Sequence, residues 1–383
     1  MQTIFRQCIG IDIAKSTFTA CICQQFNTGQ TTCSPVSEFE HSRHGFNQLL
    51  KWVRKHAVVA PQAVFVMEAT GIYYEPLAYH LHELGQPVCV VLPNKVKHYA
   101  KSLNIKSKTD IIDARLIAQM GAERALEEWT PPAEVFRNLR ALTRLYTDIK
   151  SQKTAFVNRL HSMEAGHEPL PFIVRSTKEM IRKLDREIDK TKAEITTLIA
   201  SDQGLQQKVD KLLTIKGVGL MTIAIVVAET QGFKLITNVK QLASYAGYDV
   251  VQRESGSSTK GKTRISKKGN SRIRAALYFP ALVAARHNKN FQGMYQRINQ
   301  SKASKMVGVT AVQRKLLILL YTLWREDTVY DENKANKTSG NQETKFLLRL
   351  NDAVVEKQQA DPKSLPAQDE LPLNLSTEAL LRL

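Results

Sequence analysis

Apolar residues recur with two different periods along the chain, and the change of period divides it. Short apolar runs that are typical of buried strands occur early, at residues 7–13, 18–23, 63–67 and 88–92, with another strand-like segment near 37–41. Between these runs, residues 42–53 and 74–84 carry apolar side chains at helical spacing, and Ser42 has the position of an N-cap. Strands that alternate with helices predict an α/β domain over residues 1–128.

Beyond residue 134 the apolar spacing becomes helical. Two long stripes, at residues 134–163 and 176–200, are separated by a segment with two prolines at 167–171. In the second stripe the spacing alternates between three and four residues: Ile181, Leu184, Ile188, Thr191, Ile195 and Leu198. Such a seam predicts a central coiled-coil hairpin over residues 129–204 that pairs with itself or with another subunit.

Shorter helical patterns fill the rest of the chain. They occur at residues 220–228, at 239–247, after Asn270 and at 305–324. They predict a mainly helical C-terminal domain over residues 205–330. The remaining residues, 331–383, are polar and rich in Gln, Asn and Lys, which predicts a mostly disordered tail.

The net charge of the chain indicates what kind of partner it binds. The chain carries a formal charge of +18, and residues 331–383 contribute nine acidic and seven basic side chains, so residues 1–330 carry +20. A polyanionic partner follows, and nucleic acid is the first candidate. The basic residues are spread over several segments and the longest apolar run is about nine residues, so we expect no membrane contact.

The cysteines and the N-terminus indicate the compartment. Five cysteines lie within the first 89 residues without C-x-x-C spacing, which favours buried free thiols over disulfides or a zinc site. No export signal opens the chain. We therefore expect a reducing compartment, the cytoplasm.

Four carboxylates form the first candidate site. Asp12 and Glu68 lie at the ends of separate strands that otherwise carry no charge, while Asp110 and Asp113 are three residues apart on one face of a helix. Grouped carboxylates repel one another unless a divalent cation is present, and Mg²⁺ prefers oxygen ligands and bridges to phosphate. Each residue alone has an ordinary explanation as a turn residue or helix N-terminal acid. Their order together favours a Mg²⁺ site for phosphoryl chemistry.

The second candidate site is a basic, serine-rich segment at residues 253–274. It holds five serines, three glycines, one carboxylate and eight cations: Arg253, Lys260, Lys262, Arg264, Lys267, Lys268, Arg272 and Arg274. Cations can hold a nucleic-acid backbone while a hydroxyl attacks phosphorus. Taken alone, the segment is more typical of a flexible, solvated basic loop than of an active site.

A glycine-rich turn precedes this segment. Lys216, Gly217 and Gly219 lie between two predicted helices, where exposed backbone N–H groups favour a phosphate. The turn resembles a helix-hairpin-helix, which grips the DNA backbone without reading bases. A plain glycine-rich turn has the same pattern.

Several motifs resemble one family. The order of IGIDIAK, MEATGIYYEPLA, VLPNKVKHYA and KTDIIDAR is similar to the RuvC-like (RNase H-fold) domain of DEDD insertion-sequence transposases of the IS110 family, relatives of Piv-type DNA invertases. ESGSS, ISKKGN and RAAL resemble the C-terminal transposase domain of the same family. The resemblance covers roughly residues 7–326. It implies that Asp12, Glu68, Asp110 and Asp113 form the catalytic tetrad and that Ser255 is the nucleophile, with Ser257 and Ser258 as alternatives.

The function that this resemblance implies is site-specific DNA recombination. Ser255 would form a covalent phosphoserine with donor or target DNA, Mg²⁺ would bind the tetrad, and the two parts would meet as one composite site across subunits. The resemblance also implies a structured bridge RNA and a homo-oligomer, a dimer or a dimer of dimers. Two alternatives remain: a RuvC-type nuclease that uses water, and a nucleic-acid-binding accessory protein without catalysis.

Overall fold

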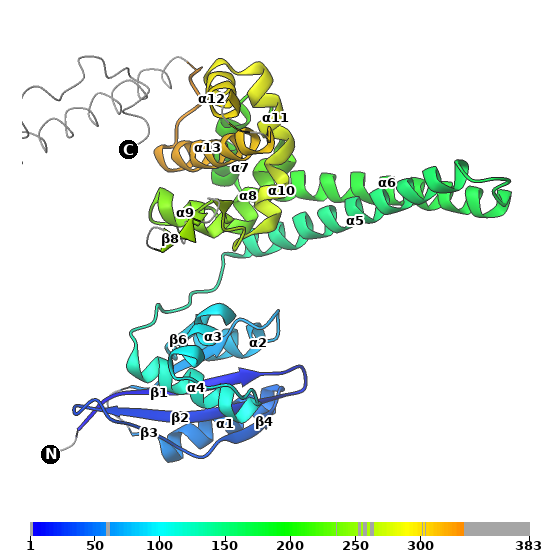
Figure 1. Ribbon diagram of the computed structural model, residues 1–383. Helices are drawn as coiled ribbons and strands as arrows, with labels where there is room; N and C mark the ends of the chain where they lie inside the picture. The colour runs from blue at the N-terminus through cyan, green and yellow to red at the C-terminus, as the bar shows by residue number, and fades with distance from the viewer. Residues whose placement is uncertain are drawn as a thin grey trace, which may run out of the picture. The chain divides into compact units, whose positions relative to one another are not determined.

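The chain folds as two compact units in the computed structural model, Met1–Pro132 and Ala133–Leu383 (Figure 1). The structure describes residues 3–58, 62–234, 236–251, 254–255, 259–260, 264–300, 302 and 304–332. The first unit is α/β and the second is mostly helical, which confirms the predicted fold class at this level. Arg253, Ser257, Ser258, Lys262 and almost all of the predicted tail lie outside the described residues, and only the backbone of Ser255 and Lys260 is described.

A six-stranded sheet forms the centre of the first unit. Its strands are β1 (Ile4–Ile13), β2 (Thr17–Phe26), β3 (Thr31–Cys33), β4 (Ser37–Glu40), β5 (Val64–Glu68) and β6 (Val88–Val91). Their order is β3-β2-β1-β5-β6, and β4 also pairs with β2. Strand β1 is antiparallel to β2 but parallel to β5, and β5 is parallel to β6. The carboxyl ends of β1, β5 and β6 therefore meet at one edge.

Helices cover both faces of this sheet: α1 (Arg43–His56), α2 (Glu75–Glu83), α3 (Pro93–Ser102) and α4 (Asp110–Glu123). Ser42 caps α1 as predicted, because its Oγ accepts a hydrogen bond from Gly45 N at 3.2 Å. Alternate residues of β1 enter different cores. Ile9 packs with side chains of α1 and α2, whereas Cys8 packs with α3 and α4.

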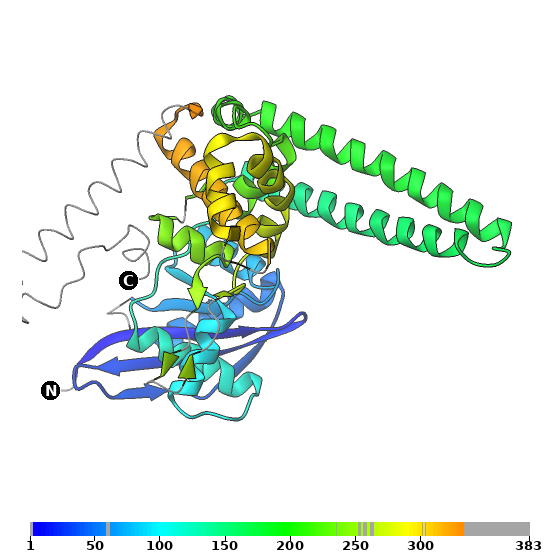
Figure 2. The same cartoon turned by 45° about the horizontal axis from the view of Figure 1, so that its top comes forward.

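The second unit begins with a long helical hairpin. Helices α5 (Glu134–Glu164) and α6 (Pro171–Ala200) run side by side and project from the other helices (Figures 1 and 2). Along α6 the buried positions include Ile188, Thr191 and Ile195 of the predicted seam, and Ile199 is buried at the base where the spacing predicted Leu198. The helix starts earlier than predicted, with Pro171 in its first turn, a position that tolerates the missing N–H.

Within the described part of this unit, shorter helices pack around the base of the hairpin: α7 (Gln203–Leu213), α8 (Leu220–Thr230), α9 (Val239–Ala246), α10 (Ser271–Ala276), α11 (Tyr278–His287), α12 (Lys289–Gln300) and α13 (Met306–Glu326). Leu139 of α5 and Leu316 of α13 are fully buried in one shared core, so the hairpin base and these helices fold together. By length and composition α13 could cross a membrane, but half of that apolar window is buried within the unit, as in a core helix.

Candidate carboxylate site and nucleic-acid interface

Two of the four carboxylates are placed by strand register. Ile11 of β1 pairs with Met67 of β5 in parallel, so Asp12 and Glu68 each follow a paired residue on neighbouring strands. Both side chains lie at the carboxyl edge of the sheet. Thr70 Oγ1 donates a hydrogen bond of 3.4 Å to Glu68 Oε1.

The other two carboxylates come from the first turn of α4. Thr109 caps this helix, since its Oγ1 accepts from Ile112 N at 3.3 Å, and Asp110 and Asp113 follow in the first turn. Thr19, which pairs with Asp12 across β1 and β2, donates through Oγ1 to the backbone oxygen of Asp110 at 3.2 Å. This bond attaches the start of α4 to the strand next to Asp12.

Close backbone contact brings α4 onto β1. A Cβ placed on Gly10 would lie 2.0 Å from the backbone nitrogen of Ala118, and one on Gly121 would lie 2.3 Å from Cys8 Sγ. Only glycine fits at either position, and the helix therefore lies directly against the strand that ends in Asp12. A glycine within a strand, such as Gly10, together with small residues such as Ala114 on a helix, is a sequence signal for this close contact that hydrophobic periodicity does not reveal.

The four carboxylates lie near enough to influence one another electrostatically. Burial, and after it the charges of Asp113, Asp110 and Glu68 in that order of size, together raise the pKa of Asp12 to about 6. Burial likewise raises the pKa of Asp113, which the Lys108 ammonium opposes from 3.9 Å. The structure thus brings together the four residues that the sequence predicted as a tetrad.

The serine segment forms two short ladders, where the sequence predicted a loop. Strand β7 (Val250–Val251) pairs antiparallel with β10 (Arg264–Ile265), and β8 (Glu254–Ser255) pairs with β9 (Thr259–Lys260). Ser255 stands opposite Thr259. The paired residues include Val and Thr, which favour extended backbone, and this local preference competes with the small polar residues between them.

The glycine turn before α8 has the backbone geometry that its sequence requires. Gly217 has φ of +87°, and a Cβ there would lie 2.6 Å from Val283 Cγ1. Ile215 and Val218 are buried and anchor the turn, while Lys216 is exposed and Gly219 is the N-cap of α8. The turn presents the N-terminus of α8 and one lysine on the surface.

Comparison with known proteins agrees with both parts of this geometry. One family model, described as a transposase of the IS110 DEDD type, matches residues 9–167 and so includes all four carboxylates. A second, described as a transposase of the IS116/IS110/IS902 family, matches residues 209–296 and includes the glycine turn and the serine segment.

Whole-length relatives decide the family. The pilin gene-inverting protein of Moraxella bovis is 31% identical over 85% of this chain and 97% of its own length, and that of Moraxella lacunata is 32% identical over the same shares. The transposase for insertion sequence element IS1328 of Yersinia enterocolitica is 26% identical over 70% of this chain and 81% of its own length. The chain belongs to the IS110 family of transposases. It is accordingly a DNA transposase or recombinase.

Membership in a DEDD transposase family suggests dependence on a divalent metal, and the donor set fits an open site. Among the described residues, no three His, Cys, Asp or Glu side chains are close enough to form a complete ligand cluster. Mg²⁺ is usually held by one or two carboxylates together with waters and substrate phosphates, so a closed cage is not required. Four mutually repelling oxygen donors around Asp12 match that chemistry.

The predicted cations of this transposase differ in what they contact. Arg272 donates through Nη1 to Thr147 Oγ1 at 2.8 Å and to Asp148 Oδ1 at 3.3 Å, and Arg274 donates through Nη1 to the backbone oxygen of Ala246 at 2.7 Å. These two guanidinium groups hold the segment to α5 and α9. Other predicted DNA contacts are exposed in the structure: Lys216, Arg264, Lys267 and Lys268.

A buried ion pair that the sequence analysis missed joins the transposase hairpin to the serine segment. Glu229 of α8 is 3% exposed. It accepts bonds from Arg144 Nε at 2.8 Å, Arg144 Nη2 at 3.0 Å and Asn270 Nδ2 at 2.7 Å. Asn270, which lies within the basic segment, in turn caps α10. The signal was a single carboxylate at the end of the apolar run of α8, which requires a partner when buried.

Proposed function

We propose that this transposase cuts and rejoins DNA strands with Ser255 as the nucleophile and Mg²⁺ at the Asp12, Glu68, Asp110 and Asp113 site. One observation carries the proposal. Four carboxylates from three separate elements converge at one edge of the sheet. Their mutual repulsion destabilises the charged form of Asp12, and together with burial it raises the pKa of that residue. Clusters that cost stability in this way are typical of functional sites. The strand order, with antiparallel β2 beside parallel β1, β5 and β6, supports an RNase H-like (RuvC-like) assignment for this unit.

The covalent step belongs to the serine. Ser255 Oγ attacks the phosphorus of a backbone phosphodiester, the new P–Oγ bond forms, and the bond from phosphorus to one deoxyribose oxygen breaks. The serine proton is lost, and the departing deoxyribose oxygen takes up a proton to become a hydroxyl. Rejoining reverses these changes when the hydroxyl of another strand attacks the phosphoserine, so no external energy source is needed. Mg²⁺ at the carboxylates would stabilise the negative charge that develops on the phosphate oxygens.

The carboxylates and the serine lie in different units, so we propose that they meet in the assembled protein, across subunits. The α5–α6 hairpin supports an oligomer, a dimer or a dimer of dimers. Its far end carries exposed apolar side chains, including Leu170, Phe172 and Met180, the kind of surface that contacts another chain.

A structured bridge RNA is the proposed source of sequence choice. The net charge of +18 fits a protein that binds RNA as well as DNA backbones. Base pairing by a guide would read the donor and target DNA, while the protein holds backbones through groups such as Lys216 and Lys268. Sequencing of the nucleic acid that copurifies with the protein tests this. A discrete RNA is expected, and heterogeneous fragments would contradict it.

Trapping of a protein–DNA adduct tests the serine mechanism. The full-length protein is incubated with end-labelled element DNA and Mg²⁺, denatured, and examined for label that migrates with the protein. Wild type and the Ser257→Ala variant should form the adduct, while Ser255→Ala should not. Asp12→Ala should abolish strand cutting.

Each alternative predicts a different result. If Ser255→Ala cuts DNA at the normal rate and wild type forms no adduct, water is the nucleophile, as in a RuvC-type nuclease. If Asp12→Ala leaves recombination undiminished, the carboxylates are incidental and the accessory-protein alternative holds.

A further inference from the structure

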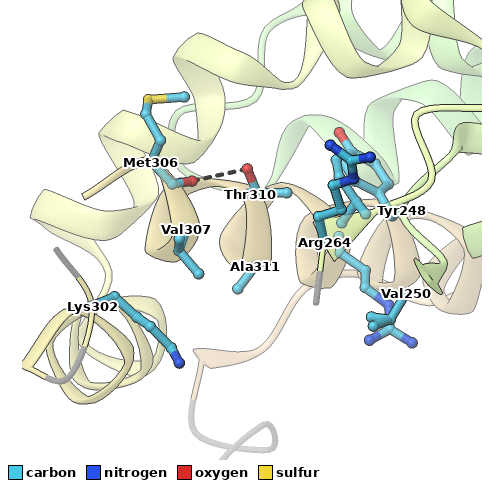
Figure 3. A pocket seen from close by; sticks show the side chains of 10 residues that line it. Tyr248, Val250, Arg264, Lys302, Met306, Val307, Thr310 and Ala311 are labelled. Carbon is cyan, nitrogen blue, oxygen red and sulfur yellow. Dashed lines mark hydrogen bonds between the residues drawn. The ribbon is translucent and has the colours of Figure 1, made fainter. Parts of the chain in front are cut away.

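A pocket in the helical unit lies at the base of the serine segment (Figure 3). Its volume is about 430 Å³, within the range of small-ligand sites. Figure 3 shows Val307 and Ala311 projecting from α13 on one side, with Lys302 on one flank and Val250 and Arg264 on the other. The pocket is thus built from α13, the segment before it, and the β7–β10 ladder.

The interior of the pocket is apolar and open to solvent. Met306 and Val307, in the first turn of α13, are 48% and 44% exposed, and Val250 is 54% exposed. The ring of Tyr248, which is fully buried, forms part of the lining. Exposed apolar side chains gathered around one cavity indicate a site for an apolar group.

The margin of the pocket is cationic. Arg264, Lys302 and Arg314 line it, and the described lining residues include no Asp or Glu. An apolar interior with several cations and no carboxylate is complementary to an apolar group joined to an anion, and for a DNA recombinase the fitting ligand is a base joined to phosphate. A neutral apolar peptide would leave the three cations without partners.

The position of the pocket relates it to the nucleophile. Val250 and Ile265 pair with each other across β7 and β10, and both line the pocket. Ser255 follows Val251 by four residues, a span of at most roughly 14 Å in an extended chain. A nucleotide in the pocket would therefore lie within a few nucleotides of a phosphate held at Ser255.

We propose that this pocket holds one unpaired nucleotide of the DNA strand that is cut, with its base against Val307 and Ile265 and its phosphates at Arg264, Lys302 and Arg314. The inference rests on the proposed function, because it takes Ser255 as the position of cutting. Extracting a base from the stack costs a few kcal/mol, which contact with an apolar pocket offsets. Such a site would favour DNA that is distorted next to the cutting position.

The test measures binding without cutting. In a Ser255→Ala background, full-length protein is titrated with three fluorescent probes: a DNA duplex with a single-nucleotide bulge, the same duplex without the bulge, and a single-stranded RNA of the bulged sequence. The variant Val307→Trp fills the pocket, and Arg314→Ala removes one cation. Lys315→Ala, the neighbouring exposed cation outside the lining, and Val329→Trp, an exposed apolar position elsewhere, are the matched controls.

Both pocket variants should weaken binding of the bulged duplex about tenfold, because one fills the space for the base and the other removes a cation that faces the phosphate, and they should leave the regular duplex within about twofold. The controls should change neither, and all variants should keep the wild-type melting temperature. Equal losses for both duplexes, or no loss, would overturn the proposal. A loss confined to RNA would assign the pocket to RNA instead. Failure of the serine mechanism would appear in the adduct assay and would leave these binding results unchanged.

Discussion

Replacing Arg144 by Met tests the buried ion pair that joins α5 to α8. The guanidinium forms two bonds to Glu229, and the side chains of Arg144 and Glu229 are 44% and 2% exposed. Met keeps much of the aliphatic contact and removes the charge. The carboxylate would then be buried with Asn270 as its remaining partner among these bonds.

The cost follows from leaving a buried charge unpaired. Removing one partner of a buried pair typically costs about 3–5 kcal/mol. Because Arg144 is partly exposed and Asn270 keeps its bond, we expect the lower end, roughly 3 kcal/mol. For a unit of this size, each kcal/mol of lost stability lowers Tm by about 2–4 °C. The helical unit of the variant should therefore melt at a temperature roughly 6–12 °C lower.

The pH dependence of the stability is a second, independent test of the pair between Arg144 and Glu229. Burial raises the pKa of Glu229, but the bonds from Arg144 and Asn270 outweigh it, so the folded pKa lies below its ordinary value of 4.5. In wild type this stabilisation is present above the unfolded pKa and is lost as pH falls through the folded pKa. Without Arg144, burial dominates and the folded pKa rises. The penalty of the variant is then full at neutral pH and shrinks as acid protonates Glu229.

Calorimetry of the full-length chain measures both effects. The matched control is Lys192→Met, because Lys192 is also 44% exposed and also pairs with a carboxylate, Asp189, at 3.2 Å. Asp189 is 74% exposed, so this change should cost at most about 1 kcal/mol. If Arg144→Met lowers Tm no more than the control, or if its loss of stability grows in acid, the buried Glu229 carboxylate does not depend on Arg144 for its stabilisation.

Two further predictions concern the α/β unit. Gly10→Ala should destabilise the unit by about 3 kcal/mol, because the new Cβ would lie 2.0 and 2.5 Å from backbone atoms of α4. The control is Gly293→Ala in α12, where the new Cβ would have open space around it. In the same melting experiment this change should be neutral or stabilising. Cys8 and Cys89 should resist Ellman's reagent at pH 8 in the folded chain and react after denaturation, because burial raises the pKa of Cys89 to about 11 and that of Cys8 well above its usual value. Fast labelling of either thiol without unfolding would show that this core is not closed.

The convergence of Asp12 and Glu68 at one edge of the sheet could be predicted, because apolar runs in the sequence identify the strands that they end. Asp12 and Glu68 each end an apolar run, and runs of that kind belong to one parallel sheet whose carboxyl ends coincide. The contact that brings α4 to them was not predictable in the same way. It depends on Gly10 and Ala118, more than one hundred residues apart, and single-sequence periodicity contains no information about such a pair.

In the basic segment, the contacts of the individual cations could not be predicted from the sequence. Eight cations within 22 residues look alike in the sequence, but Arg272 reaches Thr147 and Arg274 reaches the backbone of Ala246, partners that no local pattern identifies. Helix α3 was also not predicted, because its cations are frequent and only Val96 and Tyr99 are buried. Charge therefore indicates a nucleic-acid partner well and identifies the individual contacts poorly.

The same internal contacts explain how the serine segment is supported. Its C-terminal end is attached to three helices, through Asn270 to Glu229 of α8, through Arg272 to α5 and through Arg274 to α9. The ladder that contains Ser255 is of a different kind, because there β8 pairs with β9 of the same segment. The C-terminal end of the segment is therefore held by the helical core, whereas Ser255 lies in a ladder whose two strands both belong to the segment. If the proposed pocket holds a nucleotide, the phosphate presented to Ser255 would lie within a few nucleotides of it.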